Sequence, residues 1–152
     1  MEELEFDLDK VEALDFDKLA PQLIYIFKSE ADIANFIQFL KNVQKFVSLS
    51  NDKRHTTLIE LGYFKSQIQK FERQIAGLIA KKKNAVQKAG IKKAKMVGEK
   101  LTESVISYYT EEDNAIEGLE KIHNIVKCWS DYMVDLTYLC GQTNKMLGNF
   151  LN

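Results

Sequence analysis

The stretch LEKIHNIVKCWSDYMVDLTYLCGQTNKMLGNF, residues 119–150, decides the fold of this chain. Its apolar residues recur at alternating spacings of three and four, which is the a/d pattern of a heptad repeat. The repeated positions are Leu119, Ile122, Val126, Trp129, Met133, Leu136, Cys140, Thr143, Leu147 and Phe150. Such a repeat predicts one long, coiled-coil-like C-terminal helix.

A second apolar row lies beside the first, on the g positions Ile125, Tyr132, Leu139 and Met146. Because a two-stranded seam needs only a and d, apolar g positions indicate that at least two neighbours cover this helix. A helix of about 60 Å is long for one small chain to cover, so we expect other copies of the chain to supply part of the cover. The expected oligomer interface consists of Leu119, Ile122, Val126, Trp129, Met133, Leu136, Leu139, Leu147 and Phe150.

The rest of the chain also has a helical pattern, since one proline and seven glycines in 152 residues are too few for the turns of a β fold. Asp15 predicts the start of a short helix that runs to about Lys28. Ser29, with an acid three residues later, predicts the start of a second helix that ends near Ser48. The polar sequence SLSNDKRH then predicts a loop, and a long helix is expected from about Thr56.

Two further signals lie before the C-terminal helix. The chain is expected to form a short helix over residues 102–109, and Thr110 with the three acids after it resembles a capping box that starts the final helix. Together these features predict an all-α, elongated and oligomeric helical bundle. Its three segments are the acidic N-terminus with short helices (1–55), the long helix with a lysine-rich stretch (56–100) and the oligomerisation helices (101–152).

Charge is strongly segregated along the chain although the net charge is only -1. Residues 1–20 carry eight acidic and two basic residues, whereas residues 65–100 carry eleven basic and two acidic ones. Residues 101–152 are acidic again, with eight acids and three bases. Blocks of this kind indicate that the basic part meets an anionic partner or the acidic ends of the same protein.

Four lysines of the basic block share one helical face, because Lys81, Lys88, Lys92 and Lys95 are separated by seven, four and three residues. A stripe of this kind can follow a phosphate backbone. The alternatives are a solvated face, an acidic protein partner or a lipid surface, although the stretch lacks the apolar face of a membrane-surface helix. The predicted nucleic-acid-binding residues are Lys81, Lys82, Lys83, Lys88, Lys92, Lys93 and Lys95.

Aromatic residues near this block have two interpretations. The pairs Tyr108 with Tyr109 and Tyr63 with Phe64 could stack on unpaired bases. Aromatic residues at helical spacing are more often part of a core, however, so core packing is the alternative for both pairs.

Enzymatic and membrane functions have little support in the sequence. Its two histidines, His55 and His123, have no nearby cluster of metal-ligating residues, and no phosphate loop or nucleophile motif is present. We therefore expect a protein that is not an enzyme and has no cofactor or metal. The acidic N-terminus lacks the pattern of a secretion signal, and the apolar run 23–27 is too short to span a bilayer. Cys128 and Cys140 are expected to be reduced, which favours the cytoplasm.

The lysine-rich helix, the following GEKLTESVISYYTEED and the tail VKCWSDYMVDLTYLCGQTNKMLGNFL together resemble the recombination mediator family of tailed phages typified by UvsY. The resemblance covers about residues 70–152. It implies a small helical protein that forms a ring-like homo-oligomer through its C-terminal helices and binds single-stranded DNA in the host cytoplasm. It also implies that the protein helps a RecA-like recombinase to displace the single-strand-binding protein.

The family's short Lys-Ala-Arg element for DNA binding is similar to Lys93-Ala94-Lys95 here. Lysine in place of arginine keeps the charge but loses the planar group that stacks and binds two oxygens at once. Phosphate contact is therefore expected to survive this difference. The alternative function is a non-enzymatic protein-interaction module, such as a phage assembly chaperone or an inhibitor, which binds no nucleic acid.

Overall fold

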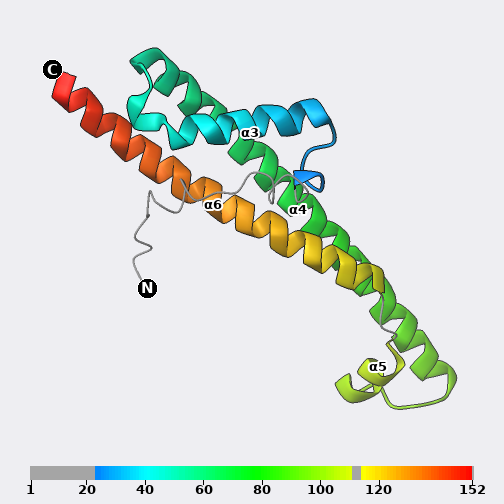
Figure 1. Cartoon of the computed structure of the whole chain (residues 1–152). Coiled ribbons are helices and arrows are strands. Elements are labelled where there is room, and N and C mark those ends of the chain that lie inside the picture. The colour runs from blue at the N-terminus through cyan, green and yellow to red at the C-terminus, as the bar shows by residue number, and fades with distance from the viewer. Residues whose placement is uncertain (1–22, 111–113, 152) are drawn as a thin grey trace. The chain divides into compact units, whose positions relative to one another are not determined.

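The computed structural model describes residues 23–110 and 114–151, and over these residues the chain is helical with no strand, which confirms the predicted all-α class (Figure 1). The helices are α3 (Glu30–Gln44), the 3-10 turn η1 (Phe46–Ser48), α4 (Asn51–Met96), α5 (Glu103–Tyr109) and α6 (Asn114–Leu151). They form two compact units. Of the described residues, unit 1 contains 23–71 and 126–151, and unit 2 contains 72–110 and 114–125.

Helix α3 begins where the sequence predicted. The Ser29 hydroxyl accepts a hydrogen bond of 3.1 Å from the backbone N–H of Asp32, which caps the first turn. The helix ends at Gln44, and η1 then carries the chain to Ser48. The helix expected before α3 lies largely outside the described residues, and its described end is a turn in which the backbone N–H of Phe27 donates to the carbonyl of Leu23 at 2.9 Å.

Helix α4 begins at Asn51, so the predicted start at Thr56 is wrong. Ser50 supplies the cap, because its carbonyl accepts from the Arg54 backbone N–H at 2.9 Å and its hydroxyl accepts from the Lys53 N–H at 3.4 Å. The buried Arg54 guanidinium also donates to the Leu49 carbonyl and to the Asn51 side chain. The polar residues that suggested a loop therefore satisfy the free backbone groups at a helix start.

The core of unit 1 is aromatic and joins three helices. Phe36 of α3 is fully buried, and its ring centroid lies 5.1 Å from that of Phe64 on α4 and 5.5 Å from that of Trp129 on α6. Phe27 packs on the same ring at 5.0 Å and Phe39 at 5.9 Å. Figure 1 shows α3 crossing α4, and the contact of Phe36 with Trp129 places α6 beside it. Such aromatic pairs add about 0.5–1.5 kcal/mol each to the burial of their surface.

The a/d residues of the C-terminal helix have two environments. Val126, Trp129, Met133, Leu136 and Cys140 are buried in unit 1 by the same chain, with at most 6% of each residue exposed. These five residues are therefore covered within one chain, and Phe36 of α3 is one of the side chains involved, through its contact with Trp129. The partly exposed interface candidates are Leu119, Ile122, Leu139 and Leu147, and the side chain of Phe150 lies outside the described part. Self-association stays a prediction.

Unit 2 contains the second half of α4, helix α5 and the first turns of α6. Helix α4 continues through Gly90 and ends in a Schellman motif, in which Gly98 has a φ of +73° and the Glu99 N–H donates to the Ala94 carbonyl at 3.1 Å. The expected short helix is confirmed as α5, whose N-cap Thr102 accepts from the Val105 N–H at 3.3 Å. The acids of the capping box predicted after Thr110 lie outside the described residues.

Candidate nucleic-acid interface

The predicted lysine stripe lies on the outer face of α4 in unit 2. Lys81, Lys88, Lys92 and Lys95 are all exposed. The buried positions Ile75, Gly90 and Ala94 lie on the opposite side of the same helix, by its 3.6-residue period. Because this stretch is a continuous helix, the four ammonium groups form a row about 21 Å long.

The charges of this row have few compensating acids. No acidic residue occurs between Glu72 and Glu99, so the helix offers the lysines no carboxylate one turn away. Within residues 23–110 and 114–151, no ion pair involves the four stripe lysines. Their positive potential is therefore directed at solvent, where it can attract a polyanion.

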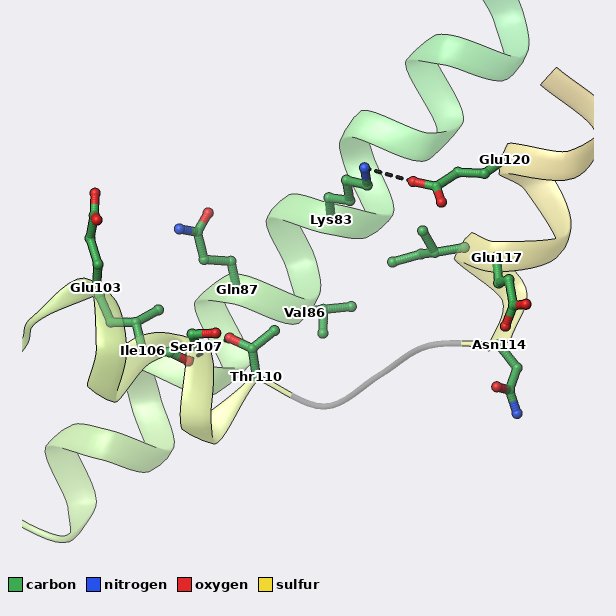
Figure 2. A pocket seen from close by; sticks show the side chains of 11 residues that line it. Lys83, Val86, Gln87, Glu103, Ile106, Ser107, Thr110, Asn114, Glu117 and Glu120 are labelled. Carbon is green, nitrogen blue, oxygen red and sulfur yellow. Dashed lines mark hydrogen bonds and ion pairs between the residues drawn. The ribbon is translucent and has the colours of Figure 1, made fainter. Parts of the chain in front are cut away.

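The structure separates Lys83 from the stripe. Its Nζ lies 2.7 Å from Oε1 of Glu120 on α6, and both side chains are about half exposed (Figure 2). An exposed pair of this kind contributes less than about 1 kcal/mol to stability, but it holds the ammonium group toward α6. Lys82 and Lys93 are exposed on the arc between the stripe and the buried face. The seven predicted residues thus form one row of four and three separate positions.

An open hollow in unit 2 lies beside this pair (Figure 2). Its volume is about 830 Å³, and its walls come from α4, α5 and the start of α6. Three carboxylates, those of Glu103, Glu117 and Glu120, and one ammonium group, that of Lys83, line it. The excess of negative charge makes the hollow unsuitable for a phosphate, so the stripe is the better candidate for contact with a nucleic acid.

The structure distinguishes the four aromatic candidates for base stacking. Phe64 is buried in unit 1, and the exposed Tyr63 lies edge-on to it with ring centroids 5.4 Å apart. Tyr109 is partly buried, and its hydroxyl donates to Glu99 Oε1 at 3.3 Å. Desolvation and the Glu99 carboxylate raise the pKa of Tyr109. Tyr108 is 81% exposed, so it is the most accessible of the four rings.

Two neighbouring titratable groups of α6 are affected by burial. Burial raises the pKa of the Cys140 thiol to about 11. The pKa of the Tyr132 hydroxyl is also raised, mainly by burial and to a smaller extent by the electrostatic effect of Cys140. His123 Nε2 lies 4.0 Å from Glu72 Oε1. In the described ranges, no three His, Cys, Asp or Glu side chains are placed to hold a metal ion. None of the described helices combines the length and apolar character needed to cross a membrane.

Comparisons with known proteins give no relative from which a function could be transferred. No protein-family model matches the sequence, and neither a curated protein nor a solved structure matches it significantly. The resemblance of residues 70–152 to the phage mediator family therefore stays a prediction.

Proposed function

We propose that this chain binds single-stranded DNA through Lys81, Lys88, Lys92 and Lys95 and acts as a recombination mediator. The observation that carries the proposal is the exposed row of four lysines on a continuous helix that has no acidic residue between Glu72 and Glu99. Lysine ammonium groups act as point charges, so they bind phosphates without reading bases. We therefore expect binding that does not depend on DNA sequence.

The strength of this binding should depend steeply on salt. Each phosphate neutralised on a single strand contributes about -0.7 to the slope of log K against log salt, so four contacts give a slope of about -3. Binding should then weaken about 50-fold between 50 and 200 mM salt. One row of contacts is weak by itself, and several copies that hold one strand would combine into a much tighter complex.

The mediator role and the preference for single strands rest on the resemblance. On this proposal the protein is a non-enzymatic homo-oligomer of the host cytoplasm that holds DNA covered by single-strand-binding protein. The strand would be kept in place while that protein leaves and a RecA-like recombinase loads. A strand-exchange assay with the recombinase and single-strand-binding protein of the same source should show a shorter lag when this chain is added.

The stripe itself is tested by fluorescence anisotropy with labelled oligo-dT between 50 and 200 mM salt. The variant K81Q/K88Q/K92Q/K95Q removes the four charges and keeps residues that favour helix. We expect it to lose most of the salt slope, because the phosphate contacts are gone.

The matched control is K28Q/K53Q/K127Q/K145Q, which removes four exposed lysines of unit 1. Its net charge equals that of the stripe variant. It should keep the slope of the unaltered protein. An equal reduction of the salt slope in the two variants would mean that net charge alone causes binding. Absence of an anisotropy change at 50 mM salt would refute DNA binding and favour the protein-interaction module.

A further inference from the structure

We infer that Tyr108 is a base-stacking residue for the same single strand, so that the protein holds bases as well as phosphates. This inference rests on the proposed function. Of the two tyrosines in unit 2, Tyr108 is 81% exposed and Tyr109 is partly buried, so Tyr108 is the one accessible to an unpaired base. Base–aromatic stacking tolerates any sequence, because every base has a π face.

The C-terminal end of α5 lies against α4, which gives Tyr108 a defined position. A Cβ atom at Gly90 would lie 2.6 Å from Thr110 Oγ1 and 3.1 Å from Thr110 Cα, so the two backbones are nearly in contact. The Thr102 cap holds the other end of α5. A ring on so short a helix therefore need not be ordered by its ligand, which lowers the entropic cost of stacking.

The orientation of the ring follows from the helix period. Ile106 is partly buried and Thr110 contacts α4, whereas Tyr108 lies midway between them in sequence and so about half a turn away on α5. Tyr109 supports it, because the two ring centroids are 5.1 Å apart with planes at 86°. Tyr109 is itself held by its hydrogen bond to Glu99. Tyr108 thus has one aromatic neighbour and is still 81% exposed.

The surroundings of Tyr108 in the sequence fit a nucleic acid. The turn from α4 to α5 begins directly after the last stripe lysines and carries the exposed Lys100. Apolar side chains are also exposed here, namely Met96 at the end of α4 at 79%, and Val97 at 60% and Leu101 at 43% in the turn. Because α5 packs on the Gly90 side of α4, opposite the stripe, the strand would have to pass around the C-terminal end of α4 to reach Tyr108. On that path it would meet the cation and the apolar side chains of the turn before α5, which combines phosphate and base contacts as in single-strand binders.

The test compares Tyr108→Ala with the unaltered full-length protein on two labelled strands, oligo-dT and an abasic strand of equal length. The abasic strand keeps the phosphates and lacks the bases. We expect Tyr108→Ala to weaken oligo-dT binding about fivefold or more and to leave binding of the abasic strand unchanged. Tyr108→Phe keeps the ring and should bind oligo-dT like the unaltered protein.

Tyr138→Ala is the matched control, since Tyr138 is a 70% exposed tyrosine on α6 in unit 1, and it should bind both strands normally. If the unaltered protein binds neither strand, the proposed function fails and this inference fails with it. If the unaltered protein binds with the expected salt slope and Tyr108→Ala equals it on oligo-dT, the stacking inference alone fails. Loss of binding to phosphatidylserine vesicles in Tyr108→Ala, with unchanged DNA binding, would instead identify the turn as a lipid contact and overturn the inference.

Discussion

At the scale of the residue, Gly90 shows that a helix-weakening residue can be required by packing. A glycine in the interior of a helix costs roughly 1 kcal/mol relative to alanine, and the sequence contains Gly77 and Gly90 in the same helix. Their surroundings differ: a Cβ at Gly77 would meet nothing within 4 Å, whereas one at Gly90 would press on the side chain and backbone of Thr110. The same substitution should therefore have opposite effects at the two positions.

We predict that Gly77→Ala stabilises the protein by up to about 1 kcal/mol, because only the helix propensity changes. Gly90→Ala should force α5 away from α4, since the atoms that block a Cβ include the Thr110 backbone, which cannot rotate aside. Hydrogen–deuterium exchange measures this directly, and residues 103–109 should exchange faster in Gly90→Ala only. Unchanged exchange of α5 in that variant would contradict the close contact.

At the scale of the element, α4 is one helix with two different surfaces. Before Ile79 its apolar residues recur at helical spacing, and Leu61, Phe64, Ile68 and Ile75 are buried. After Ile79 only small residues, Gly90 and Ala94, are buried, and lysines occupy the outer face. Because the helix is continuous, the register set by the packed half also determines which lysines point outward.

This register predicts that two lysines five residues apart differ in their contribution to DNA binding. Lys88→Gln should reduce the salt slope by about 0.7, because a stripe lysine contacts one phosphate. Lys83→Gln should change the slope by much less, since Glu120 already compensates the Lys83 charge at 2.7 Å. The measurement is the anisotropy titration at several salt concentrations, and equal effects of the two variants would show that the stripe extends around the helix.

At the scale of the whole molecule, self-association cannot use the residues that the chain itself buries. Met133 is fully buried, whereas Met146 on the g row is 61% exposed. We predict that sedimentation at micromolar concentration shows species heavier than the 17.5 kDa chain, and heavier still with oligo-dT. An interface through α6 would then involve the residues near Met146.

The matched variants are Met146→Lys and Met133→Lys. The first should dissociate the oligomer and leave the circular dichroism spectrum unchanged, because an exposed lysine costs little. The second should unfold the protein, since it places a charge in the core. A compact monomer in the unaltered protein at these concentrations, with or without DNA, would rule out the predicted assembly.

The sequence by itself determined what depends on neighbours along the chain. Helical periodicity predicted the all-α class and the position of α6. The hydroxyl of Ser29 was correctly placed at a helix start, because a cap acts over three residues. The lysine stripe was also predicted, since spacing alone places side chains on one face of a helix. Ser50 also has a capping hydroxyl at the start of α4, but the polar residues around it suggested a loop.

Only the tertiary structure decided what depends on residues far apart in the chain. It showed that α3 covers Trp129, that Lys83 pairs with Glu120, and that Thr110 packs against Gly90. These contacts depend on the register of one helix against another, which periodicity leaves open because every turn of a helix offers a similar face. Tyr108 is exposed for a similar physical reason: Thr110 packs against α4 and Ile106 is partly buried, so the residue between them is turned toward solvent.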